Sequence, residues 1–145
     1  MYLPRYQYKT NSSFPDYEFT SEGPKGKIKK VIRFTQIDTS VYNPGFGDLN
    51  EITGEISDTV VTNNNDSRLV LATVAATAHD FTLHFPQAII IAQGSTHSRT
   101  RLYRIGITNH LKEISINFEV YGLKDGRWEL FQERRDYAAF LIHRK

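Results

Sequence analysis

The sequence contains no cysteine among its 145 residues. A disulfide framework, a zinc site built from thiolates and a cysteine nucleophile are therefore excluded. Long hydrophobic runs are also missing: the longest is AIIIA at residues 88–92, whereas a membrane-spanning helix needs about 18 apolar residues. The first residues, MYLPRYQYKTN, lack the apolar core and the small-residue cleavage site of a signal peptide. We expect a cytoplasmic protein that does not associate with membranes.

A strong charge of either sign is missing as well. The formal net charge is +2 and the isoelectric point is about 8.8, an excess too small to argue for nucleic-acid binding by itself. The basic residues instead gather locally, for example in KGKIKK (25–30) and RTRLYR (99–104). The length predicts one domain over residues 1–145, in which residues 1–16 are a possible arm.

Several catalytic and cofactor-binding motifs do not occur in the chain. No pair among the five histidines has the H-x-x-x-H or H-E-x-x-H spacing of a metal site. The G-x-S-x-G elbow of hydrolases, the Walker motif and the dinucleotide fingerprint are absent too. We therefore expect no metal and no cofactor, and whether the protein is an enzyme is left open.

The residue patterns predict an α+β fold: a mostly antiparallel twisted sheet of about six or seven strands, with two helices packed on one face. Alternating or β-branched segments predict strands at residues 17–26 (ending in a Gly-Pro turn), 27–37, 55–62, 88–91, 113–122, 127–132 and 137–142. Apolar residues at helical spacing predict helices at residues 67–85 and 95–110. Asn65 or Asp66 would cap the first helix and Pro86 would end it. Residues 38–51 are predicted to form a loop, because Asn-Pro and two glycines interrupt both patterns.

The start of the second predicted helix carries the chemistry of an anion-binding site. A buried strand is followed by glycine, hydroxyl residues and an arginine in the sequence GSTHSRTRLYR (94–104). Free backbone N–H groups at a helix N-terminus, hydroxyls and a guanidinium all favour phosphate or carboxylate. The candidate ligand-binding residues are Gly94, Ser95, Thr96, Ser98 and Arg99.

A helical wheel separates the arginines of this helix. Arg99 lies in the middle of the apolar face, which comprises Leu102, Tyr103, Gly106 and Ile107. A solvated polar face lies opposite and comprises His97, Arg101, Arg104 and Thr108. A guanidinium on the apolar face needs a partner, because an unpaired buried charge is costly. That partner is either a ligand anion or an internal carboxylate such as Asp48 or Asp66.

A second candidate site is the predicted loop YNPGFGD (42–48), which carries Tyr42, Asn43 and Asp48. Loops of this composition often line a site on a rigid scaffold, although the segment could equally be a turn around a packed aromatic ring. If the protein is catalytic, Asp48 or His97 is the available acid or base, and Arg99 is the available anion stabiliser.

Five segments together resemble a known group of proteins: SEGPKGKIKKVIRF, YNPGFGD, NNND with LVLATVA, GSTHSRTRLYR and YAAFLI. The group consists of small uncharacterised bacterial proteins, common in Bacteroidetes and labelled hypothetical, and the resemblance runs from about residue 17 onward. It implies a stand-alone bacterial cytoplasmic domain but no particular activity. By size and context alone, small proteins of this kind include toxin–antitoxin components.

Three functions remain open from the sequence. The first is a phosphate- or anion-binding domain for a nucleotide or a nucleic-acid backbone, whose salt-sensitive binding would be lost more in Arg99→Ala than in Arg104→Ala. The second is a toxin-like ribonuclease or another enzyme acting on phosphodiesters. The third is a non-catalytic protein-interaction domain, in which an exposed edge strand pairs with a protein partner or forms a homodimer.

Overall fold

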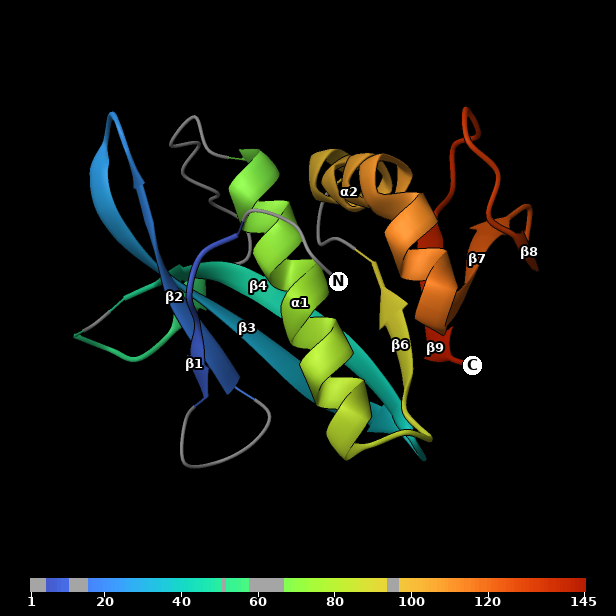
Figure 1. Cartoon of the computed structure of the whole chain (residues 1–145), viewed down its shortest axis with the longest axis horizontal. Helices are drawn as coiled ribbons and strands as arrows, with labels where there is room; N and C mark the ends of the chain where they lie inside the picture. Colours follow the sequence, from blue (N-terminus) through green and yellow to red (C-terminus); the bar gives the residue numbers. More distant parts are fainter. Residues whose placement is uncertain (1–4, 11–15, 51, 58–66, 94–96) are drawn as a thin grey trace.

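The computed structural model describes residues 5–10, 16–50, 52–57, 67–93 and 97–145, except for the side chains of Ser57, Ser67, Arg68 and Arg99. This part of the chain forms two helices and nine strands (Figure 1). The helices are α1 (Ser67–His84) and α2 (His97–Asn117). The strands are β1 (Lys9–Thr10), β2 (Asp16–Gly23), β3 (Gly26–Asp38), β4 (Val41–Leu49), β5 (Ile56–Ser57), β6 (Ile89–Ala92), β7 (Phe118–Lys124), β8 (Arg127–Leu130) and β9 (Ala139–Arg144).

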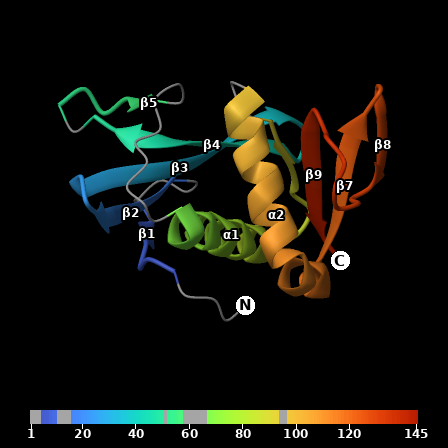
Figure 2. The same ribbon diagram turned by 90° about the horizontal axis from the view of Figure 1, so that it is seen from above.

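One sheet contains all of these strands. Its order is β1-β2-β3-β4-β6-β9-β7-β8, and β5 pairs with β4 outside that path. Within the described chain only β4 and β6 pair in parallel, and every other pair is antiparallel. Both helices cover the same face of this sheet (Figure 2), and Ile142 of β9 packs against the core clusters under both. The α+β class is confirmed, but the sheet has nine strands instead of six or seven, because β1 and β4 add to the predicted set.

Most predicted elements recur with shifted ends. Helix α1 matches the predicted 67–85 and stops at His84, just before Pro86, while its predicted caps at residues 65–66 lie outside the described residues. The Asp125-Gly126 turn forms as expected, with positive φ at both residues, as a two-residue hairpin between β7 and β8 requires. No helix in the described ranges is long and apolar enough to cross a membrane.

The prediction of a loop over residues 38–51 is wrong, because most of this segment is strand β4. Its inward positions alternate as a strand requires: Pro44 and Phe46 are buried, and Tyr42 packs on the core. The proline fits because β4 has a neighbouring strand on one side only at that point. Among the described residues, its pairing with β6 ends at Tyr42 and its pairing with β5 begins at Asp48.

The predicted boundary between the second helix and the following strand is also wrong. Helix α2 continues past residue 110 to Asn117, and β7 begins at Phe118 instead of residue 113. The alternation of apolar residues in this segment favours a strand, but a helical stripe continues through it. Its buried members are Tyr103, Ile107, His110 and Ile114. Burying this stripe keeps the segment helical and leaves Ile116 69% exposed.

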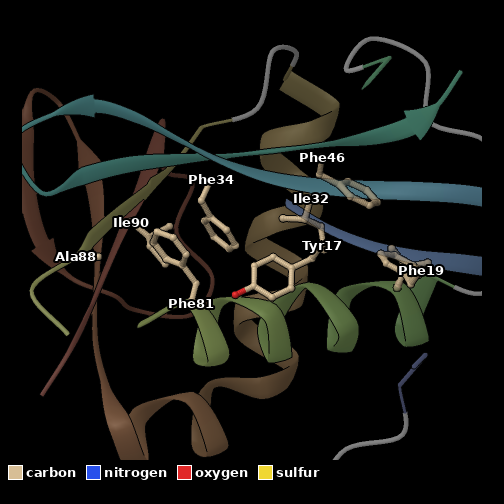
Figure 3. Close-up of a cluster of buried hydrophobic side chains, with 9 residues drawn as sticks. Tyr17, Phe19, Ile32, Phe34, Phe46, Phe81, Ala88 and Ile90 are labelled. Carbon is tan, nitrogen blue, oxygen red and sulfur yellow. The ribbon is translucent and has the colours of Figure 1, made fainter. Parts of the chain in front are cut away.

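The core beneath α1 is aromatic. Tyr17, Phe34 and Phe81 converge between the helix and the sheet (Figure 3), and the rings of Phe34 and Phe81 stack with centroids 4.4 Å apart. The Tyr17 hydroxyl donates a hydrogen bond of 2.9 Å to Asp80 Oδ2 on α1. Burial, and then this hydrogen bond, raise the pKa of Tyr17, so the phenol remains a donor. Apolar packing and one polar contact thus fix α1 on the sheet.

Arg144 attaches strand β9 to helix α1. Its Nη2 atom donates to the His79 carbonyl at 3.0 Å and to Thr82 Oγ1 at 3.1 Å, and it lies 3.2 Å from His79 Nδ1. A guanidinium has no acceptor, so Nδ1 accepts and the imidazole is neutral, with its proton on Nε2. Burial and the positive charge of Arg144 lower the pKa of His79 accordingly.

This histidine makes part of the stability pH-dependent. Its pKa is lower in the folded chain than the ordinary value of about 6.5 in the unfolded chain, so acid protonates the unfolded chain first. The stabilisation that neutral His79 contributes is therefore fully present above about pH 6.5 and is lost as the pH falls toward the lower pKa of the folded chain. We expect His79→Asn, whose Oδ1 can accept from Arg144 without titrating, to flatten the fall in the free energy of unfolding between about pH 7 and 5. Urea unfolding at a series of pH values measures this; a slope equal to that of the unmodified chain would contradict it.

Candidate functional site

A polar pocket of about 240 Å³ lies between the first two turns of α2 and the segment that connects β8 to β9. Its lining residues are His97, Thr100, Arg101, Arg104, Asp136 and Tyr137. The four from α2 are spaced i, i+3, i+4 and i+7, so they share one face of the helix. We call this site the α2 pocket.

Positive charge predominates in the α2 pocket. Arg101 is exposed and forms no ion pair with any described residue, whereas Arg104 Nη1 lies 3.3 Å from Asp136 Oδ1. The Asp136 side chain is 88% exposed, so water screens this ion pair. The first turn of α2 contains no acidic residue, so no carboxylate there offsets the positive end of the helix dipole. Two arginines against one carboxylate leave a net positive charge, which favours an anion.

Tyr137 forms a rigid wall of the pocket. Its ring packs so closely on Gly122 of β7 that a Cβ atom there would lie 2.4 Å from Tyr137 Cδ1. Its hydroxyl donates to Glu129 Oε2 at 2.9 Å and accepts from the Gln132 N–H at 3.1 Å. Burial, together with the hydrogen bond to Glu129, raises the pKa of Tyr137. The phenol therefore stays protonated and is unsuited to act as a base.

The packing of α2 determines which residues face the pocket. The Tyr103 hydroxyl donates a buried hydrogen bond of 3.1 Å to the Pro44 carbonyl of β4. Of the apolar face that the helical wheel predicts, Tyr103, Gly106 and Ile107 are buried and Leu102 is half-buried. A Cβ atom at Gly106 would lie 3.2 Å from Leu71 Cδ2, so this glycine lets α1 and α2 approach closely. With that face inward, the stripe from His97 to Arg104 turns toward the pocket.

The structure leaves the first predicted site largely untested. Residues 94–96, which include Gly94, Ser95 and Thr96, lie outside the described residues, as does the Arg99 side chain. Ser98 is described and its side chain is exposed. The identity of the Arg99 partner, whether a ligand anion or a carboxylate, therefore stays a prediction.

The second predicted site lies on a strand instead of a loop. The Tyr42 ring packs edge-on against Phe81, with centroids 4.9 Å apart, and belongs to the core. Asp48 Oδ1 lies 2.6 Å from Nζ of Lys30, directly opposite on β3, and the Lys30 side chain is only 1% exposed. Asn43 pairs with Thr35 in the same strand pair. The Asp48 carboxylate is thus bound to a buried cation, and no described contact assigns it a role as acid or base.

The site predicted from the sequence and the α2 pocket lie on the same helix but involve different faces of it. His97 and Arg101 are exposed as predicted, but Arg104 is 27% exposed and paired, and the face that they form lines a cavity. The i, i+3, i+4, i+7 spacing could have added Thr100. Asp136 and Tyr137 come from a segment more than thirty residues further along the chain, and no local pattern links them to α2.

Metal ligands do not gather at any point in the described chain: no group of three or more His, Cys, Asp or Glu side chains could hold an ion. On the outer face of the sheet, His143 Nε2 lies 3.2 Å from Glu119 Oε2, which also accepts from the Tyr121 hydroxyl at 2.8 Å. Two such ligands do not make a closed metal site. The α2 pocket carries a net positive charge, which suits an anion instead of a metal ion.

Comparison with known proteins gives a family but no function. Residues 2–145 match the model of a protein family that is described as a family of unknown function. None of the curated proteins and none of the solved structures matches the chain. The match confirms the expected membership of an uncharacterised family, and it also includes the residues before 17, back to residue 2. The bacterial origin stays a prediction.

The contact between Gly122 and Tyr137 can be tested directly. We expect Gly122→Ala to destabilise the fold by about 1–3 kcal/mol, because its methyl group would overlap the Tyr137 ring, whose hydroxyl is held by Glu129 and Gln132. Gly45→Ala is the matched control, since a Cβ atom there would meet only the Arg33 carbonyl oxygen at an ordinary 3.5 Å. Guanidinium unfolding midpoints measure both; equal midpoint shifts would show that the close contact does not exist.

Proposed function

The chain belongs to DUF6934, a family of unknown function, and we propose that it binds phosphate-bearing ligands, a nucleotide or a nucleic-acid backbone, in the α2 pocket. The observation that carries the proposal is the convergence of Arg101 and Arg104 on a cavity beside a helix N-terminus without acidic residues. Guanidinium groups bind phosphate oxygens bidentately, and helix N-termini favour anions. The cytoplasmic location predicted from the sequence is part of this proposal.

The size and the contents of the pocket limit the ligand. The cavity of about 240 Å³ is somewhat smaller than the ~300–1,000 Å³ pockets that hold drug-sized ligands, which suits a phosphate group and part of what it is attached to. Thr100 adds a hydroxyl to the lining, and His97 adds an imidazole. A ligand anion would compete with Asp136 for Arg104, and since the Asp136 side chain is 88% exposed, it can leave into water at little cost.

Binding should depend on the two arginines of the α2 pocket. We expect Arg101→Ala and Arg104→Ala each to raise the Kd for ATP and for a fluorescent ten-nucleotide RNA by roughly threefold to tenfold, because one exposed charge-assisted hydrogen bond is worth on the order of 1 kcal/mol. Raising the salt concentration should weaken binding by the unmodified chain. Lys112→Ala removes an equal charge from the exposed surface of α2 and is the matched control. Equal losses of affinity in all three variants would argue against binding in the α2 pocket.

Arg99→Ala, measured in the same titration, distinguishes two forms of the proposal. The sequence predicts that Arg99 contributes most, whereas the α2 pocket predicts larger losses at Arg101 and Arg104. A dominant loss at Arg99 would move the anion to the predicted site at residues 94–99 and overturn the pocket assignment. Fluorescence anisotropy with the labelled RNA measures all four variants under one condition.

A second candidate is a phosphodiester-cleaving enzyme, of which a toxin-like ribonuclease is one form. The position of His97 favours it, because this imidazole lines the same cavity as both arginines and could transfer a proton at a bound phosphodiester. Expression of the unmodified chain should then arrest growth, and purified protein should degrade RNA. His97→Ala should abolish both effects while it retains RNA binding. Unchanged growth and intact RNA with the unmodified chain would exclude this candidate.

A further inference from the structure

Strand β8 forms one end of the sheet. It lies at the outer edge in both views (Figures 1 and 2), and among the described residues it pairs only with β7. Exposed edges usually carry a proline, a bulge or several lysines that prevent further pairing. The sequence of β8, Arg-Trp-Glu-Leu, contains no proline and no lysine, and its register with β7 is regular.

The hydrogen-bond pattern shows which backbone groups point outward. The Phe131 N–H donates to the Val120 carbonyl at 2.9 Å, so these opposite residues form a hydrogen-bonded pair. Such pairs alternate along an antiparallel ladder, which makes Glu129 and Arg127 the residues of β8 that bond to β7. The N–H and C=O groups of Trp128 and Leu130 are therefore directed away from β7, toward open space.

The side chains of the same two residues are exposed and apolar. Trp128 is 40% exposed and Leu130 is 64% exposed. They lie opposite Leu123 and Tyr121 of β7, so all four side chains project from the outer face of the sheet, away from the helices. Outward backbone groups and exposed apolar side chains together are the features of a strand that accepts another strand.

We propose that β8 pairs in antiparallel fashion with β8 of a second copy of this chain, with Trp128 opposite the partner's Trp128. This register places Arg127 opposite the partner's Glu129, and Glu129 opposite the partner's Arg127. The edge is thus complementary in charge to itself, on both sides of a two-fold axis. Arg127 has no ion-pair partner in the described chain, and the Glu129 side chain is 31% exposed beside Arg135 and Tyr137.

The proposed register also satisfies the outward backbone groups. Because the N–H and C=O of Trp128 face the open edge, two opposed copies of this residue exchange two hydrogen bonds. Leu130 comes opposite the partner's Gly126, whose missing side chain leaves room for the Trp128 indole diagonally across the ladder. The two nine-stranded sheets then continue as one sheet across the axis.

The chain contains a single tryptophan, which lies on the proposed two-fold axis and reports on the contact. Sedimentation velocity from 1 to 300 µM should show a shift from monomer to dimer mass, and tryptophan emission should move to shorter wavelength over the same range. Leu130→Lys should raise the dimer dissociation constant at least tenfold. Ile116→Lys, which replaces a 69% exposed apolar residue on α2, should leave it unchanged.

A charge variant tests the register independently of apolar area. Arg127→Glu opposes like charges across the axis and should also raise the dissociation constant at least tenfold, while Lys112→Glu makes the same charge change on α2 and should not. Circular dichroism checks that each variant is folded, and a variant that fails this check is replaced by Trp128→Lys. A monomer at every concentration overturns the proposal, as does a dimer that persists in both edge variants or is lost equally in the controls.

Discussion

The positions of the two helices and the sheet depend on the buried hydrogen bond that the Tyr103 hydroxyl of α2 donates to the Pro44 carbonyl of β4. It joins α2 to β4 at Pro44, where β4 has a neighbouring strand on one side only among the described residues, and it fixes the rotation of the helix about its axis. The basic stripe of α2 faces the β8–β9 segment only in that rotation. The chemistry of the α2 pocket therefore depends on a contact that lies in the core and bears no charge.

Buried polar groups elsewhere have a comparable positioning role. Lys30 is almost fully enclosed, and its charge is compensated by Asp48 on the next strand and by the face of the Phe46 ring, whose centroid lies 5.6 Å away. Arg144, which is half-buried, lies 5.0 Å from the Phe118 ring while it bonds to α1. Because a buried charge is costly without its partner, each of these contacts specifies one arrangement of the elements that it joins.

Patterns that depend on neighbours in the sequence predicted the fold well. Helix α1, rich in alanine and leucine and followed by Pro86, was located to within a residue, and the hairpin at Asp125-Gly126 was correct. Strand β4 was missed because its proline is tolerated only through a gap in pairing that sequence does not reveal. The candidate site shows the same contrast. The helical period predicts the polar face of α2, whereas Asp136 and Tyr137 are brought to that face only by the tertiary structure.

The position of β9 has a consequence for how the chain becomes folded during synthesis. This strand lies between β6 and β7 in the sheet but follows both of them in the sequence. The β2–β4 meander and the β7–β8 hairpin each consist of consecutive strands and can form early, because their contacts are local. Their strands cannot join into one continuous sheet until β9 leaves the ribosome. Until then β6 and β7 each have an unpaired inner edge, and unpaired strand edges of this kind promote aggregation of incompletely folded chains.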